Sequence, residues 1–247
     1  MEVTLLAAHG TSKVGNSISE CEDRFAVSDD RLVAAISDGA SSSAYSGEWA
    51  SCLVSRYLSN PVSRIGSRWA TPAINEFASK LDYQSMPWHV ISKLARGVHA
   101  TLAGVRFDAA AATMSIVTVG DSCVAWVHPQ SGHTQHWPKI KSAGFTHSPH
   151  LISTLNADNR LLYRRRRFLE HEKFDVGSTY VFLMTDAMAK WYIGMVEVGR
   201  QPWTNLLTSL DRSSFENLVD ELRLEGALEN DDVTVVILEV RRDAVDV

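Results

Sequence analysis

The sequence has few of the features that would direct a protein to nucleic acid or to a membrane. Its 24 lysines and arginines are outnumbered by 29 acidic residues, giving a formal net charge of -5, whereas a protein that contacts many phosphates needs a basic surface. No apolar run is long enough to cross a bilayer, and the short apolar stretch near the N-terminus lacks the basic flank of a signal peptide. We therefore predict no nucleic-acid partner and no membrane association.

Cysteine is scarce, with Cys21, Cys52 and Cys123 scattered along the chain. Three cysteines are too few for a disulfide framework, and no Cys-x-x-Cys pair indicates a zinc or redox site. A reducing cytoplasm is the simplest location for such a composition. The nine histidines lack the His-Glu-x-x-His spacing of zinc hydrolases, which disfavours zinc chemistry.

Linkers and repeats are missing as well. No segment rich in proline, glycine or serine divides the 247 residues, and a composition of 45% hydrophobic and 21% charged residues is typical of a globular protein. The acidic motifs that define the candidate site are spread over the whole chain. We therefore predict one domain over residues 1–247.

Two kinds of periodicity are present. Short runs rich in β-branched residues are apolar on both alternating faces, as in strands that are covered on both sides; they are 32–37, 113–120, 124–127, 180–185 and 233–240. Apolar residues at helical spacing occur at 50–58, 74–81, 91–102 and 215–222. Thr71 with Pro72 predicts the start of the second of these helices. Ser213 with Glu216 predicts the start of the last one, and Gly226 its end.

Strands that are buried on both faces need a covering layer on each side. The regular alternation of strands and helices expected for a doubly wound sheet is missing. Two sheets packed face to face, with helices over their outer faces, satisfy the pattern. We predict an α+β fold in the form of a four-layer α-β-β-α sandwich with two mainly antiparallel sheets.

Acidic residues stand at the ends of the predicted strands. Asp38, Asp121 and Asp186 each follow a strand, and Asp231 stands just before another. Antiparallel pairing lays the end of one strand beside the start of its neighbour, so these carboxylates can meet at one sheet edge. Crowded carboxylates disfavour each other's ionisation unless a cation neutralises them. The pattern therefore predicts a site for hard divalent metal ions.

Each acidic motif alone also has an ordinary structural interpretation. Asp38–Gly39 is a common turn dipeptide, although such a turn exposes the carboxylate and leaves the Gly39 carbonyl available to a cation. Glu22 and Asp23 form an acidic pair of a kind common on solvated loops, and such pairs can also hold metal-bound water. The aspartates that follow and precede the last two strands have alternative roles as a helix cap and a turn residue.

Taken in order, the motifs EDRF, SDGASS with GEWAS, VGDS, LMTDA and NDDVTVV resemble those of the protein phosphatase 2C group of metal-dependent serine/threonine phosphatases. The resemblance covers nearly the whole chain. It implies an α-β-β-α sandwich that holds two manganese or magnesium ions at one edge of the paired sheets. It also implies hydrolysis of phosphoserine or phosphothreonine on a protein by a water that the two metal ions activate. A phosphorylated protein is then the substrate, and a kinase is a further partner.

The resemblance assigns roles to the strongest motifs. Asp38 corresponds to the aspartate that bridges both metal ions, and Gly39 to the residue whose carbonyl binds one of them. Asp186 and Asp231 correspond to the remaining direct carboxylate ligands.

Three further acids have less direct roles by the same resemblance. Glu22 falls where the family places an acid near the metals, and Asp121 resembles a residue that helps some members bind an additional, looser ion. Asp23 is expected to organise the proton that the leaving alkoxide needs. Asp23 and Asp38 are therefore the predicted catalytic residues.

The chain departs from the family pattern at three positions. Members commonly carry a phosphate-binding arginine where this chain has Ile18, and Lys13 or Arg24 is the candidate to supply the missing cation. Ala40 replaces a histidine that acts as an acid in some members. Ala187 replaces the glycine usual after the third aspartate.

These departures leave a second function open, that of a pseudophosphatase that binds or regulates a phosphorylated partner. Retention of every proposed carboxylate ligand favours the enzyme, because a buried carboxylate cluster without a metal is destabilising. A calcium-binding structural protein is disfavoured, since the chain lacks EF-hand spacing. The basic run at 164–167 is interpreted as a surface segment compensated by nearby acids. Trp49 and Trp191, beside the site motifs, are interpreted as packing residues.

Overall fold

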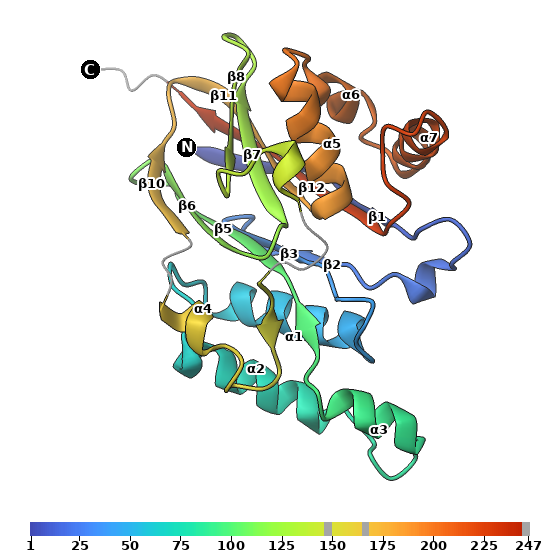
Figure 1. The fold of residues 1–247 in the computed structure, drawn as a ribbon. Helices are drawn as coiled ribbons and strands as arrows, with labels where there is room; N and C mark the ends of the chain where they lie inside the picture. Colours follow the sequence, from blue (N-terminus) through green and yellow to red (C-terminus); the bar gives the residue numbers. More distant parts are fainter. Residues whose placement is uncertain (146–149, 165–167, 244–247) are drawn as a thin grey trace.

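The computed structural model describes residues 1–145, 150–164 and 168–243, whose strands form two five-stranded sheets and a two-stranded ribbon (Figure 1). Sheet A contains, in spatial order, β1 (Glu2–Thr11), β12 (Val233–Arg242), β11 (Gly177–Met184), β7 (Cys123–His128) and β8 (His133–Trp137). Sheet B contains β10 (Phe168–Lys173), β6 (Thr113–Val119), β5 (Leu102–Asp108), β3 (Val33–Ser37) and β2 (Arg24–Val27). The ribbon pairs β4 (His99–Ala100) with β9 (Ile152–Ser153). The strands of both sheets pair antiparallel, as expected.

Helices cover the outer face of each sheet (Figure 1). Those on the side of sheet B are α1 (Ser46–Ser59), α2 (Ser67–Ser79) and α3 (Trp88–Leu94), and those on the side of sheet A are α5 (Asp186–Glu197), α6 (Pro202–Thr208) and α7 (Arg212–Leu224). The short helix α4 (Arg160–Arg164) and the 3-10 turns η1 (Ile18–Glu20) and η2 (Ser142–Gly144) lie in connections. The predicted α-β-β-α sandwich is confirmed.

Each large sheet buries both of its faces. Along β12, Val235 and Ile237 pack with residues of α5 and α7, whereas Val236 and Leu238 pack between the two sheets. The strands β7 and β11 divide their side chains between the same two cores. This division explains why the strand sequences are apolar at successive positions.

A third core lies between sheet B and its helices. Trp49 of α1 is fully buried there, with its ring edge-on to Phe77 of α2 at a centroid distance of 5.7 Å. Leu53 and Ala35 belong to the same core. The packing role expected for Trp49 is therefore confirmed.

The start of α2 differs from the prediction. The helix begins at Ser67, not at Thr71, so Pro72 lies inside it rather than in its first turn. Trp69 holds the additional turn, because its ring is buried and its indole N–H donates to the carbonyl of Asn60 at 2.9 Å. Burial of this aromatic side chain outweighs the local signal of the proline.

Two other helix predictions need correction. The helix expected over 91–102 ends at Leu94, because Gly97 adopts a φ of +87° that turns the chain away, and Leu102 begins a strand. The last helix is capped by Asp211, whose carboxylate accepts from a backbone N–H of the first turn, and not by Ser213. Apolar residues at helical spacing thus led to the prediction of a helix that overlaps the start of β5 at Leu102.

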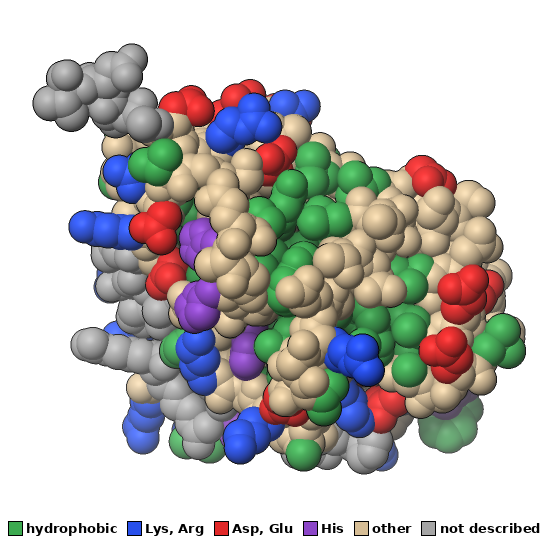
Figure 2. Space-filling model, turned by 90° about the horizontal axis from the view of Figure 1, so that it is seen from above, with side chains coloured by type: hydrophobic (Ala, Val, Ile, Leu, Met, Phe, Trp, Pro, Cys, Tyr) green, Lys and Arg blue, Asp and Glu red, His purple; other side chains and the backbone are tan. Residues whose placement is uncertain are grey.

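The surface agrees with the charge balance. On the described part of the face in Figure 2, acidic and basic side chains are interspersed and form no continuous basic surface. Within the described ranges, no helix is long and apolar enough to span a membrane. The three cysteines are buried and form no disulfide. Of the basic run at 164–167, only Arg164 belongs to the described residues, so the interpretation of that run remains a prediction.

Candidate active site

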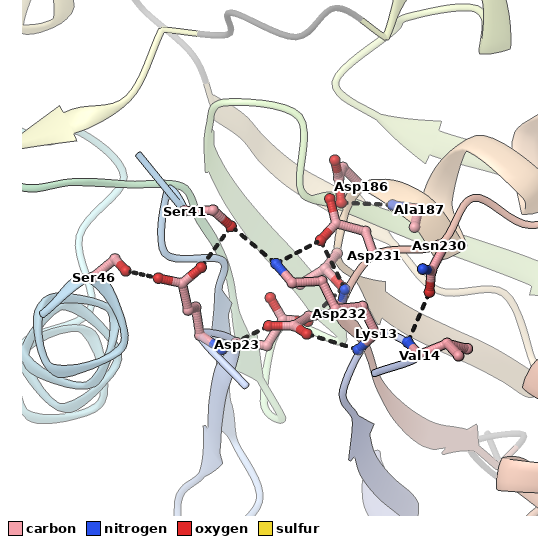
Figure 3. A network of polar contacts seen from close by, with 12 residues as sticks. Lys13, Val14, Asp23, Ser41, Ser46, Asp186, Ala187, Asn230, Asp231 and Asp232 are labelled. Atoms are coloured by element: carbon pink, nitrogen blue, oxygen red, sulfur yellow. Dashed lines mark hydrogen bonds and ion pairs between the residues drawn. The ribbon is translucent and has the colours of Figure 1, made fainter. Parts of the chain in front are cut away.

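Four of the predicted acids line one cavity of about 490 Å³. Asp38 follows β3 and Asp121 follows β6, so sheet B contributes two of them. Asp186 opens α5 directly after β11, and Asp231 precedes β12, the antiparallel neighbour of β11 in sheet A. Figure 3 shows Asp186 and Asp231 close to each other. The cavity therefore lies where the ends of strands from both sheets meet.

Asp38 is held in place through its backbone. Its N–H donates to Thr101 Oγ1, and its carbonyl accepts from the Thr101 N–H, both at 2.8 Å. The hydroxyl of Thr101 also lies 2.6 Å from that of Ser122, the residue after Asp121. Buried Thr101 thus ties the ends of β3 and β6 together, and leaves the carboxylate of Asp38 available to a ligand.

Gly39 permits the close approach of α1 to the cavity. A Cβ at this position would lie 2.6 Å from the carbonyl carbon of Ser46 and 2.7 Å from its oxygen. A larger residue would push the first turn of α1 away. Gly39 lines the same cavity as the four aspartates, as its expected role as a carbonyl ligand requires.

Burial raises the pKa values of Asp38, Asp121 and Asp186, and repulsion from neighbouring carboxylates adds to the effect at Asp38 and Asp186. Burial raises the pKa of Asp121 to about 6, and burial with the charges of Asp121 and Asp231 raises that of Asp186 to about 7. Burial raises the pKa of Asp38 well above its ordinary value, and the charges of Asp23 and the other three aspartates raise it further. These carboxyls therefore resist ionisation unless a positive charge lies nearby.

Asp23 lies beside the cavity aspartates but is not among the described residues that line the cavity. Its side chain is buried, and its Oδ2 accepts from Thr185 Oγ1 at 2.9 Å. Thr185 Oγ1 accepts in turn from the backbone N–H of Thr234. Oδ1 of Asp23 has no hydrogen-bond partner among the described residues, and burial raises the pKa of this carboxyl to about 8. Such a carboxyl carries a proton near neutral pH or lies beside a cation.

Glu22 is not brought into the cavity with the four aspartates. Its Oε2 accepts from Ser41 Oγ at 2.6 Å, and its Oε1 accepts from the hydroxyl of Ser46. Ser41 lines the cavity, so Glu22 lies at the rim and one residue removed from it. The structure therefore places Glu22 where it orients neighbouring hydroxyls.

Asp232 is a site residue that the sequence analysis missed. It is 4% exposed, and its two carboxylate oxygens accept from the backbone N–H groups of Lys13 at 2.9 Å and Glu22 at 2.7 Å (Figure 3). It therefore fastens the segment after β1 and the segment before β2 to the start of β12. The signal in the sequence was the pair of adjacent acids, Asp231 and Asp232. Successive residues at the start of a strand point to opposite sides, so the two carboxylates can have different partners.

The two cations considered as replacements for the missing arginine differ in position. Arg24 donates to two backbone carbonyls at 2.7 Å and is committed to local structure. Lys13 Nζ lies 3.4 Å from Ser41 Oγ and 4.0 Å from Asp231 Oδ1, and both of these residues line the cavity (Figure 3). Ile18 is 57% exposed. Lys13 is thus the one of the two that reaches the rim.

The donors around the cavity fit hard divalent cations. They are carboxylate and carbonyl oxygens, which manganese and magnesium prefer to softer ligands. Among the described residues, no three His, Cys, Asp or Glu side chains are arranged as a group that could hold a metal ion. Magnesium keeps several waters and is usually bound through only one or two carboxylates. Carboxylates spread around a shared cavity therefore fit hydrated ions better than one all-protein cage.

A family comparison decides the classification. The model of the family described as protein phosphatase 2C matches residues 9–225. The chain belongs to this family. Asp38, Asp121 and Asp186 lie within the matched region and Asp231 just beyond it. No curated protein matches the chain.

Solved structures share the fold of this protein phosphatase 2C member. The Mycobacterium tuberculosis serine/threonine phosphatase PstP/Ppp is 14% identical, with a TM-score of 0.61 and coverage of 98% of this chain and 100% of that one. The catalytic domain of PstP in complex with two manganese ions is 15% identical, with a TM-score of 0.60 and coverage of 97% and 99%. PppA, a regulatory component of T6SS in Pseudomonas aeruginosa, is 13% identical, with a TM-score of 0.58 and coverage of 96% and 97%. At these identities the likeness establishes the fold.

We expect the stability of the chelator-treated protein to fall as the pH rises from about 4 to about 8. The pKa values of Asp23, Asp121 and Asp186 are raised in the folded state. The folded protein then binds more protons than the unfolded chain over this range, and stability is lost as the pH passes through the raised values. Thermal unfolding midpoints in EDTA at both ends of the range measure the effect. Asp23→Asn, a neutral isostere, should flatten the dependence, and a midpoint that rises with pH in the unaltered protein would contradict the prediction.

Asp232→Ala should lower the free energy of unfolding by about 1–3 kcal/mol, because it leaves two partly buried backbone N–H groups without an acceptor. Urea denaturation measures the change. Asp29→Ala, at an exposed position in the turn between β2 and β3, is the control and should change stability by less than about 0.5 kcal/mol. Equal effects of the two substitutions would show that the clamp by Asp232 does not stabilise the fold.

Proposed function

We propose that this protein is a metal-dependent phosphomonoester hydrolase that removes phosphate from phosphoserine or phosphothreonine on a protein. The observation that carries the proposal is the convergence of four aspartates on one cavity, three of them with raised pKa values, in a chain of the protein phosphatase 2C family. The residues involved extend from Lys13 to Asp232, so the proposal includes a single domain that spans the chain.

In this proposal Asp38, Asp186, Asp231 and the Gly39 carbonyl hold two manganese or magnesium ions, and Asp121 holds an additional looser ion. When bound, such ions lower the pKa of a water molecule and neutralise charge on the phosphoryl oxygens. Asp38 would be the central ligand, because its carboxyl is buried and the charges of the other site aspartates act on it.

Asp23 acts on this site without lining the cavity. Its charge raises the pKa of Asp38, and the charge of Asp186 raises its own. We therefore assign Asp23 a positioning role in which its carboxyl, held by Thr185, keeps or releases a proton according to the charge of its neighbours. This differs from direct proton transfer to the leaving group, because Asp23 lies outside the cavity lining.

Lys13 is the side chain that we assign to the phosphoryl oxygens in place of the arginine. Its backbone is fixed by Asp232, and its ammonium group lies beside Ser41 and Asp231 at the rim of the cavity. An ammonium group binds phosphate as a point charge, without the two-pronged geometry of a guanidinium. Weaker orientation of the substrate is the expected consequence.

A pseudophosphatase that binds a phosphorylated partner is the second candidate. The exposed Ile18 in place of the arginine favours it. Retention of Asp38, Asp121, Asp186 and Asp231 around one cavity favours the enzyme. Either function implies a phosphorylated protein as partner, together with the kinase that phosphorylates it.

Manganese-dependent hydrolysis of p-nitrophenyl phosphate and of a phosphopeptide is the expected result for the wild-type protein. Asp38→Asn should lower both rates by about 100-fold or more, because the water and the phosphoryl group lose the charge arrangement that activates them. Asp29→Asn, at an exposed position in the turn between β2 and β3, is the matched control and should retain full activity. Turnover no greater than that of Asp38→Asn would favour the pseudophosphatase.

Lys13→Met should raise KM for the phosphopeptide about 10-fold and weaken inhibition by inorganic phosphate by a similar factor, because one charge-assisted contact is lost. Lys13→Arg should retain most of the affinity. Manganese binding, followed by the shift of the unfolding midpoint, should remain in both variants. Lys93→Met on α3 is the control. An unchanged KM in Lys13→Met would place the anion-binding group elsewhere.

A further inference from the structure

A second cavity, here called the side groove, adjoins the site. It has a volume of about 330 Å³ and lies between Ser142 of η2, Trp191 and Gly194 of α5, and the turn at Gly226 after α7. Two residues, Lys190 and Glu229, line both the side groove and the cavity of the aspartates. Their side chains form an ion pair at 2.5 Å. This ion pair therefore lies at the boundary between the two spaces.

Displacing the Lys190–Glu229 ion pair costs little free energy. The side chains of Lys190 and Glu229 are 36% and 55% exposed. An exposed ion pair of this kind contributes only about 0–1 kcal/mol. A segment of polypeptide that leaves the cavity can therefore displace it and continue into the side groove.

Small residues give the side groove its depth. Gly194 lies within α5, where glycine is less favourable than alanine by about 1 kcal/mol. A Cβ at Gly194 would lie 3.5 Å from the Cβ of Ser142 on the opposite side. Ala187 and Ala227 also line the side groove, and Met195 contributes an aliphatic surface. The gap between Gly194 and Ser142 is thus about one methyl group wide, and the small, mainly apolar lining favours an uncharged side chain of a bound segment.

Trp191 lines the side groove with a side chain that is mostly buried in the core. Its side chain is 6% exposed, and its indole Nε1 has no hydrogen-bond partner in the described part of the chain. Buried indole N–H groups usually have a partner. This nitrogen is itself enclosed, and Trp191 belongs to the core between sheet A and its helices, so the packing role expected for Trp191 is confirmed.

We propose that the side groove binds the segment of the protein substrate next to its phosphorylated residue, with an aliphatic side chain of that segment lying over Gly194. This inference rests on the proposed phosphatase function. The side groove is continuous with the cavity through Lys190 and Glu229, so a chain whose phosphate lies at the aspartates extends into it. The apolar lining selects for leucine or a similar residue over a charged one.

Substitution of Gly194 tests the inference. Gly194→Leu should fill the side groove and lower kcat/KM for a phosphopeptide with a flanking leucine about 10-fold or more. Manganese-dependent hydrolysis of p-nitrophenyl phosphate should be unchanged, because this substrate has no flanking segment. Gly194→Ala should have a small effect, and Val198→Leu, outside the side groove at the end of α5, should have none.

A panel of phosphopeptides provides a second measurement that needs no variant. Leucine and glutamate are exchanged at each position on either side of the phosphoserine, and the wild-type protein should prefer leucine at one of them. Equal rates across the panel, or a Gly194→Leu variant that loses both activities equally or neither, would overturn the assignment of the side groove. Failure of the wild-type protein to hydrolyse p-nitrophenyl phosphate would instead refute the proposed function itself.

Discussion

Repulsion among carboxylates confined to one cavity is the constraint on which the rest of the structure depends. Asp38, Asp121 and Asp186 are all held in surroundings that oppose their ionisation. Local sequence cannot hold such a cluster together, because its members are far apart in the chain. The three cores of the sandwich supply the stability, and backbone hydrogen bonds such as those of Thr101 fix the positions.

The site is a product of the pairing of two sheets. Sheet B contributes the aspartates after β3 and β6, and sheet A contributes those at the ends of β11 and β12. Neither sheet alone has the full set of oxygen donors. Formation of the cavity is therefore coupled to formation of the core between the sheets, and a cation that binds there stabilises the whole sandwich rather than one element.

Much of the fold could be predicted because the strands β3, β6, β7, β11 and β12 are apolar on both faces, a pattern with few structural solutions. The strand β5 was missed because its first residue, Leu102, continues a helical spacing that Gly97 interrupts only through its backbone conformation. The choice between Lys13 and Arg24 could not be made from sequence, since it depends on which cation the backbone carbonyls already bind. The hydrogen bonds from Lys13 and Glu22 to Asp232 could not be predicted either, because these residues are far apart in the sequence.

The paired acids at the start of β12 also fix its alignment. Because this strand is apolar on both faces, sliding it by one residue past its neighbours would still bury hydrophobic side chains, and apolar pattern alone discriminates weakly between the alternatives. A shift by one residue in one direction would place Val233 where Asp232 binds the two backbone N–H groups. A shift in the other direction would place Asn230 where Asp231 lines the cavity. Only the observed offset gives both places a carboxylate, so Asp231 and Asp232 together mark the correct frame of the central strands.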